Sequence, residues 1–460
     1  FTPWVDHWNE LPQTAQFAPG RQSGVYPNAP PGLLFFGDEG VPRGMARRAL
    51  NHWAPRVGVA IDPFGDGRSS IRAGYGLFWD TLIPTEQAQQ YASQLPVFTA
   101  STAIIRPQSL ANPYGGATPT FLVPLPRARD YVFPKPVNTA VRFNAPGYTS
   151  AYTQQWNLTL ERQVLKDTMV RVTYQGSQAN RLPIAYESNP AAYTAGSSTR
   201  ANTQQRRPFN PDFASVLVVD SFGKSWYHGL VVSGERRFTS DLAVTASYTF
   251  SRNIDTGMTV NSANVASANN PYNPLNDKGL ADADRPHAFV ASYVWNLPRF
   301  ESAPLPIRYL LGGWQHNGIV ALYSGTPFSI ISGVDNSLSG VNQDRADLIG
   351  SPSLDSGRSK ADKIAAYFNT AAFALNREGT FGTAGRNILR APGSINIDMS
   401  VFKNIPLWEE HALQLRGEFF NVPNRTNLGG PNANVSSTLF GRITSAGSPR
   451  VIQIALKYIF

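Results

Sequence analysis

The sequence contains no cysteine, few charged residues and no long apolar run. The absence of cysteine excludes disulfides, thiolate metal sites and cysteine nucleophiles, and it fits any compartment, a bacterial outer membrane included. Because no run of about 18 apolar residues is present, no transmembrane helix is expected. The opening residues, FTPWVDHWNE, have neither the basic start nor the apolar stretch of a signal peptide. The missing signal peptide implies either a cytoplasmic protein or a chain whose start is absent.

The charge balance is basic but dispersed. Charged residues make up 15% of the chain, and the formal net charge is +9. No block of five or more like charges occurs, so nucleic acid is not an expected partner. Attraction to anionic lipid or lipopolysaccharide explains the basic balance at least as well.

Alternation of apolar and polar residues with period two is widespread, whereas helical periodicity is nearly absent. In Leu242–Asn253, for example, the even-numbered positions up to Phe250 are apolar and the odd-numbered ones are mostly Ser and Thr. The expected strands are 53–62, 69–80, 151–163, 168–177, 227–238, 242–253, 287–298, 312–325, 395–404, 411–422 and 451–460. A soluble β-sandwich also produces such strands, so alternation alone does not decide the fold.

The lengths of the connections are more informative. Short links at 63–68, 164–167, 239–241, 299–311 and 405–410 alternate with long segments at 81–150, 178–226, 254–286, 326–394 and 423–450. Compact soluble domains rarely carry structureless loops beyond about 12–15 residues. Transmembrane β-barrels combine short periplasmic turns with long extracellular loops. The sequence therefore predicts an all-β protein, an antiparallel transmembrane β-barrel in meander order with about 11–12 strands.

The last strand, VIQIALKYIF, has one wholly apolar face, and its other face carries Gln453 and Lys457. If the short turns are periplasmic, strand directions alternate and the eleventh strand runs toward the periplasm. Outer-membrane barrels also end on the periplasmic side. A terminal aromatic residue with alternating apolar residues is also the signal read by the barrel-assembly machinery. The predicted lipid-facing assembly signal is Ile452, Ile454, Leu456, Tyr458 and Phe460.

Aromatic residues make up 12% of the chain and recur near the ends of the expected strands. Rings at these positions are typical of the girdles at membrane interfaces. Core packing in a soluble sandwich is the alternative. Besides the two rings of the last strand, the predicted girdle comprises Tyr75, Trp79, Tyr248, Phe250, Trp295, Trp314 and Phe419.

Several stretches resemble the barrel of TonB-dependent receptors, in the Oar-like group of acidobacterial type. They are PRVGVAIDPFGDGRSSIRAGYGLFWD, YTQQWNLTLERQ, WYHGLVVSGERRFTSDLAVTASYTFSRNID, DRPHAFVASYVWNLP, LLGGWQHNGIVALYSGTPFSI and, most specifically, the tail from GTFGTAGRNILRAPG to the last residue. The resemblance implies an outer-membrane receptor of a Gram-negative bacterium. Such a receptor passes a large ligand, such as a siderophore, glycan, peptide or protein, with energy from the TonB complex.

The sequence also departs from the family pattern. A signal peptide, a small carboxypeptidase-regulatory-like domain, a plug domain and a TonB box are not recognised in it. About eleven or twelve strands are expected, half of the family's 22-stranded barrel. We therefore expect residues 1–460 to be the C-terminal portion of the receptor barrel, either open or closed into a smaller barrel. The alternative function is a structural or adhesive barrel displayed on the surface without active transport.

No catalytic constellation is present, so the protein is not expected to be an enzyme or to hold a cofactor. The six histidines are far apart in sequence, and none has the spacing of a zinc-binding pair on a helix. The densest polar cluster is DADRPH, residues 282–287. Its polar residues either contact ligand at an extracellular rim or simply begin a strand. The candidate rim contacts are Asp282, Asp284, Arg285 and His287.

Overall fold

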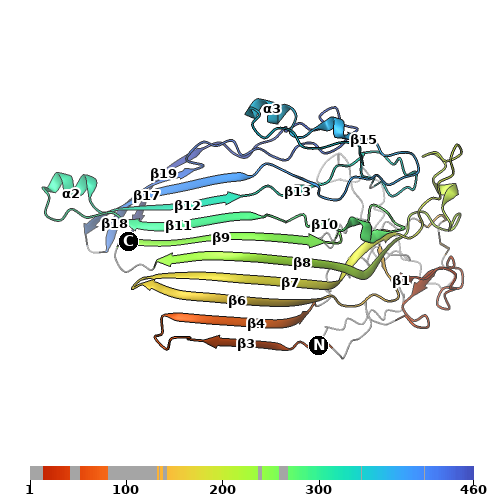
Figure 1. The fold of residues 1–460 in the computed structure, drawn as a ribbon, viewed down its shortest axis with the longest axis horizontal. Coiled ribbons are helices and arrows are strands. Elements are labelled where there is room, and N and C mark those ends of the chain that lie inside the picture. Colours follow the sequence, from red (N-terminus) through yellow and green to blue (C-terminus); the bar gives the residue numbers. More distant parts are fainter. Residues whose placement is uncertain are drawn as a thin grey trace, which may run out of the picture.

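The computed structural model describes residues 14–41, 52–80, 132–133, 135–137, 142–236, 241–257, 268–342, 344–408 and 410–460. Its main feature is a curved sheet of long strands that lie side by side (Figure 1). Long connections gather at one end of the strands, and short turns lie at the other. These two ends are called the loop end and the turn end below.

Within the described residues the sheet has fifteen strands, of which eleven follow one another in chain order, each pairing antiparallel with the next. These eleven are β3 (Arg56–Ile61), β4 (Ser69–Trp79), β6 (Tyr152–Leu165), β7 (Thr168–Glu187), β8 (Leu217–Arg236), β9 (Leu242–Asp255), β11 (His287–Asn296), β12 (Trp314–Tyr323), β17 (Ser394–Trp408), β18 (His411–Phe420) and β19 (Val451–Ile459). All eleven overlap the ranges that alternation predicted, although several differ at their ends, and the antiparallel meander is confirmed. We call these eleven strands the wall.

The wall is open. Within the described residues, the path of paired strands begins at β3 and ends at β19, and no pairing joins the two. All residues of β3 are exposed, as are all residues of β19 except the last. Of the two arrangements left open by the sequence, the described residues have the open one, in which each edge strand is paired on one side only.

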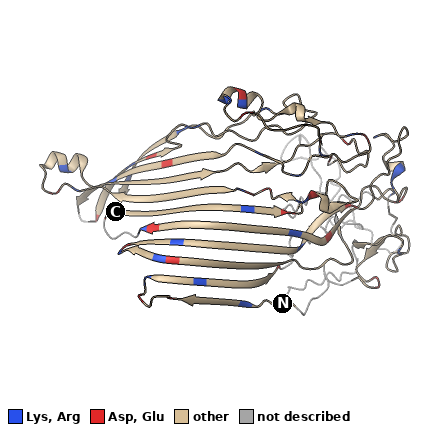
Figure 2. Ribbon diagram, viewed as in Figure 1, with Lys and Arg blue, Asp and Glu red and all other residues tan. Residues whose placement is uncertain are grey.

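The register gives the wall one apolar and one polar face, because directly opposite residues in antiparallel strands point to the same side. One apolar row crosses nine strands through Ile61, Ile71, Leu160, Val172, Val232, Tyr248, Phe289, Leu322 and Ile395. The adjacent row on the other side is mostly polar and runs through Ser70, Glu161, Arg171, Ser233, Ser247, Val290, Ala321 and Asn396. Charged residues are sparse along the strands (Figure 2).

Buried apolar side chains are found at the loop end and not in the middle of the wall. Among the described residues, the core clusters contain no residue of β3, β4, β6, β9, β11, β12, β17, β18 or β19. The largest cluster includes Phe17, Phe35, Phe143 and Phe213, and a second one surrounds Phe368. A soluble sandwich would bury one face of each strand, whereas this wall leaves both faces uncovered.

No strand was predicted in the long connections or before residue 53, but the described parts of both contain regular structure. They contain the strands β1 (Thr14–Phe17), β2 (Leu33–Phe35), β5 (Arg142–Asn144), β10 (Gly279–Leu280), β13 (Pro327–Phe328), β14 (Asp347–Leu348), β15 (Phe373–Ala374) and β16 (Leu389–Arg390), the helix α3 (Lys360–Ala365) and the 3₁₀ turns η2 (Gln204–Arg206), η3 (Pro274–Asp277) and η4 (Thr370–Ala372). Strand β5 pairs in parallel with β1 and β8, which departs locally from antiparallel pairing.

Helices were also not expected, yet a second one, α2 (Leu305–Leu311), lies within the predicted short turn 299–311. None of the helices in the described ranges is long and apolar enough to cross a membrane.

Candidate functional site

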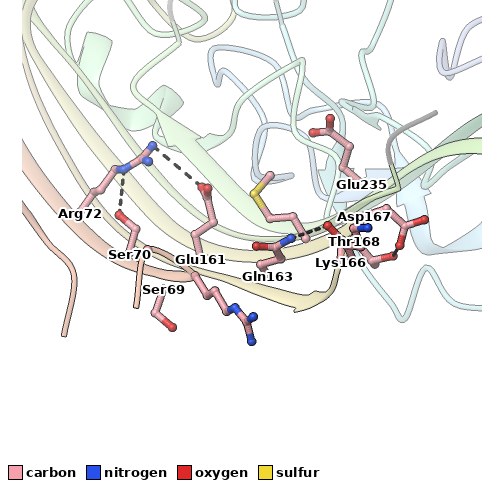
Figure 3. Close-up of a pocket in the computed structure, with 12 residues that line it drawn as sticks. Ser69, Ser70, Arg72, Glu161, Gln163, Lys166, Asp167, Thr168 and Glu235 are labelled. Carbon is pink, nitrogen blue, oxygen red and sulfur yellow. Dashed lines mark hydrogen bonds and ion pairs between the residues drawn. The ribbon is translucent and has the colours of Figure 1, made fainter. Parts of the chain in front are cut away.

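The polar face of the wall is the first candidate site. Near the turn end, Glu161 Oε2 accepts a hydrogen bond from Arg171 Nε at 2.9 Å and lies 3.9 Å from Arg72 Nη1. Figure 3 shows Arg72 extended toward Glu161 on the neighbouring strand β6 and toward Ser70 on its own strand β4. Ser70, Arg72 and Glu161 line a depression of about 300 Å³ together with Gln163 and others. The group offers both cationic and anionic atoms to a polar solute or to water.

A second depression, of about 350 Å³, continues along the same face. Its lining includes Thr173, Gln175, Ser233 and Ser247, whose side chains carry hydroxyl and amide groups. One of these groups already has a partner outside the lining, because Gln175 Nε2 donates a hydrogen bond to the Tyr227 hydroxyl at 3.3 Å. Two adjoining polar depressions make this face a hydrophilic surface along β4, β6, β7, β8 and β9.

The second candidate site is a group of ion pairs at the loop end. The Asp284 side chain is 1% exposed and forms an ion pair with Arg390. Arg386 pairs with Asp255 and, at 2.8 Å, with Asp282. These pairs connect the last residue of β9 and the segment after it to Arg386 and Arg390, more than a hundred residues later in the chain. We call them the loop-end clamp.

The structure brings the four residues of the DADRPH cluster to one rim but gives each an intramolecular partner. Asp282 and Asp284 belong to the clamp, and Asp282 keeps 62% of its side chain exposed. The Arg285 guanidinium lies 5.0 Å from the Tyr323 ring, and His287 Nδ1 is 2.7 Å from the Tyr248 hydroxyl. Contact with a ligand stays a prediction for these residues. Of the Asp282 and Asp284 carboxylates, that of Asp282 is the more accessible.

Arg386 and Arg390 were not singled out from the sequence, although both lie in the tail motif that carried the resemblance. Isolated arginines beside glycine in a long loop gave no indication of their partners. The opposite charges of the two loops were the only signal in the sequence, and they do not show which aspartate pairs with which arginine.

Four histidines share one arrangement on the apolar face of the wall. In each pair, the histidine Nδ1 lies within hydrogen-bond distance of a tyrosine hydroxyl on an adjacent strand. The pairs are Tyr174–His228 at 2.8 Å, Tyr248–His287 at 2.7 Å, Tyr293–His316 at 3.1 Å and Tyr458–His411 at 2.7 Å. Throughout the described part of the chain, no group of three or more metal-ligating side chains occurs.

The aromatic residues predicted as a girdle all lie on the apolar face. The directly opposite pairs are Tyr75–Trp156, Trp79–Tyr152, Tyr248–Phe289, Phe250–His287, Trp295–His316, Trp314–Lys403 and Phe419–Ile452. Trp79 and Phe250 lie toward the loop end, whereas Trp295 and Trp314 flank the α2 connection at the turn end. Their role at a membrane interface stays a prediction.

The terminal strand follows the same parity. Ile452, Ile454, Leu456 and Tyr458 lie opposite Phe419, Gly417, Leu415 and Leu413 on the apolar face. Gln453 and Lys457 lie opposite Glu418 and Gln414 on the polar face. Phe460 follows the strand and is 87% exposed. The register therefore gives the expected two faces, and the role of these residues in assembly stays a prediction.

A curved antiparallel wall with one apolar face, one polar face and folded loops at one end has the organisation of a membrane β-barrel. The family model described as "Outer membrane beta barrel domain" matches residues 1–453, and the chain belongs to that family. The protein is accordingly located in the outer membrane. No curated protein is similar to this chain in sequence.

Three solved structures of other outer-membrane proteins are similar to the chain at low identity. The outer membrane transporter YddB from Escherichia coli is 12% identical with a TM-score of 0.46, over 88% of this chain and 40% of that one. The ferripyoverdine receptor of Pseudomonas aeruginosa is 8% identical with a TM-score of 0.40, over 88% and 32%. The FrpB iron transporter from Neisseria meningitidis is 11% identical with a TM-score of 0.41, over 88% and 38%. The chain thus spans less than half the length of these proteins.

Proposed function

We propose that this chain forms part of the barrel wall of a TonB-dependent transporter of the Oar-like type, in the outer membrane of a Gram-negative bacterium. The observation that carries the proposal is the open eleven-stranded wall with a continuous polar face. Small barrels of about eight strands fill their interior with side chains, whereas barrels of about 22 strands enclose a plugged lumen. An open, gently curved wall with polar depressions fits the larger kind.

In this proposal the apolar face contacts lipid, including lipopolysaccharide in the outer leaflet, and the polar face borders the lumen. The clamp at the loop end holds the outer loops in place, with Asp282 as the candidate rim contact for ligand. The ligand belongs to a class too large for a small pore, such as a siderophore, glycan, peptide or protein. The TonB complex and the barrel-assembly machinery are the expected protein partners.

A surface barrel with a structural or adhesive role is the second candidate. It is favoured by the folded outer connections, whose own cores include Phe35, Phe213 and Phe368. Rigid loops of this kind present a fixed surface to a binding partner, with or without transport.

The dependence of ligand accumulation on energy separates the two functions. Cells that express the full-length gene product would be given panels of labelled ferric siderophores, oligosaccharides and peptides, with and without a protonophore. A transporter should accumulate one class of ligand only while the proton-motive force is intact. Binding that is equal with and without the protonophore would contradict transport and support the adhesive function.

A further inference from the structure

The α2 helix exposes an unusual apolar surface at the turn end of the wall. It lies in the connection between β11 and β12 and projects beyond the strand ends (Figure 1). Leu305, Ile307, Leu310 and Leu311 are 63%, 44%, 70% and 60% exposed, and Tyr309 is 54% exposed. A helix that is apolar around nearly its whole circumference is normally buried, and a contiguous exposed apolar patch marks a contact surface. This helix therefore needs a covering environment.

The attachment of α2 shows which face of the wall it belongs to. Trp314 Nε1 donates a hydrogen bond to Leu310 O at 2.9 Å, and Lys403 Nζ donates to Gly312 O at 2.6 Å. The Lys403 ammonium also lies 5.3 Å from the centre of the Trp314 ring. Trp314 and Lys403 lie opposite each other on the apolar face. The helix is thus tied to the side of the wall that contacts lipid.

The end of the helix is held closely at a glycine. A Cβ atom on Gly312 would lie 2.3 Å from Arg299 O and 2.7 Å from Arg308 O, so a larger residue would not fit without movement of the backbone. The two arginines of this crowded corner are also exposed. The connection therefore presents two cations, Arg308 within the helix and Arg299 just before it.

We propose that α2 is an interfacial anchor that inserts into the phospholipid leaflet on the turn side of the outer membrane. Its leucine and isoleucine side chains lie among the acyl chains, and Arg299 and Arg308 lie near the lipid phosphates. Apolar residues combined with basic ones are the chemistry of helices that lie in a membrane interface. Continuity with the lipid-facing surface at Trp314 favours lipid over a protein partner as the occupant. This inference does not depend on transport.

The lack of cysteine in the chain makes a site-specific test direct. A cysteine-free full-length gene product carrying Leu310→Cys would be labelled with an environment-sensitive fluorophore. It would then be reconstituted into phosphatidylethanolamine and phosphatidylglycerol vesicles. Lys166→Cys, exposed in the turn between β6 and β7 at the same end, is the matched control. Heat-modifiable gel mobility would show that each variant is folded, and Ile307→Cys would replace Leu310→Cys if the latter misfolds.

The proposal predicts that the Leu310 label is quenched several-fold more by nitroxide-labelled lipid than the Lys166 label is, and several-fold less by iodide. Equal iodide quenching at the two positions would overturn the proposal, because it would place α2 in water. Protection from iodide without quenching by nitroxide-labelled lipid would also overturn it, because it would indicate a protein contact, such as a second copy of the chain.

Discussion

Removal of Arg390 should open the outer loops without unfolding the wall. The Arg390 guanidinium pairs with the buried Asp284 carboxylate and donates from Nη1 to Gly325 O and Asp284 O, each at 3.2 Å. In the Arg390→Ala variant, the Asp284 carboxylate keeps the Asn253 N–H at 2.5 Å but loses its cation. The variant therefore leaves a nearly buried charge only partly compensated.

The size of the effect follows from the burial of the two partners. Breaking a fully buried ion pair by removing one partner costs about 3–5 kcal/mol. Here the Arg390 side chain is 32% exposed, which allows water to replace part of the lost interaction. We therefore expect a local cost of about 2 kcal/mol, because pairs that reach solvent contribute less than buried ones. Since about 1.4 kcal/mol corresponds to a factor of ten, the open state should be populated roughly 30-fold more.

Hydrogen exchange measured by mass spectrometry on the purified full-length protein is a suitable assay. The peptides that cover residues 280–287 and 384–391 should exchange faster in the variant, whereas those from β6 and β7 should be unchanged. The control is Arg377→Ala, which removes an exposed arginine from the same long connection. Equal exchange in Arg390→Ala and Arg377→Ala would refute the clamp as a stabilising feature, and faster exchange in β6 and β7 would refute its local action.

Three further predictions concern the wall and the loops. Leu456→Arg should impair barrel folding far more than Gln453→Arg, because a charge on the lipid face near mid-membrane costs about 2–4 kcal/mol. Heat-modifiable gel mobility in outer-membrane fractions measures the folded fraction of each variant. If the two variants fold equally badly, the assignment of the lipid face is wrong by one residue. Gly318→Val should lower stability by about 1–3 kcal/mol through overpacking, since its Cβ would lie 2.5 Å from Tyr293 Cε1; an unchanged denaturation midpoint would count against the close packing. Burial raises the pKa of the Asp344 carboxyl above its ordinary 3.8, so the folded loop binds the carboxyl proton more tightly than the unfolded loop does. The stability of the loop should therefore fall as pH rises from about 4 through the raised pKa. Asp344→Asn should remove this pH dependence from hydrogen exchange of the loop, and an unchanged pH dependence would refute the prediction.

The wall could be predicted from sequence because the membrane imposes period two on every strand that crosses it. The predictions failed where that constraint ends. Strand β7 continues to Glu187 and β8 begins at Leu217, each ten residues beyond the alternating segments. There the pair covers buried loop residues such as Val216, so the side chains follow local packing instead of the contrast between lipid and lumen. The prediction also ended β17 at Asn404, before IPLW, whereas the strand continues through Pro406 to a shift in register.

The outer connections could not be predicted because their cores are assembled from distant segments. Phe17, Phe143 and Phe213 meet in one cluster, although nearly two hundred residues separate the first from the last. No local period relates such positions, and a lone aromatic residue in a polar loop has many possible partners. The ion pairs of the clamp are similar, since Arg390 and Asp284 are fixed only when both loops fold. The α2 helix was missed because seven residues between prolines and glycines are too few for a helical period to be visible.

The central claim is that alternate residues of the wall face lipid and water. Strand β9 tests it most directly, because Ala246 lies on the apolar face and Ser247 on the polar face. Single cysteines would be introduced at these two positions in the cysteine-free full-length protein and treated, in permeabilised outer membranes, with a charged, membrane-impermeant maleimide. The account predicts that Ser247→Cys is labelled rapidly and that Ala246→Cys is protected until the membrane is dissolved and the protein denatured. Equal labelling at both positions, or labelling of Ala246→Cys alone, would contradict the account.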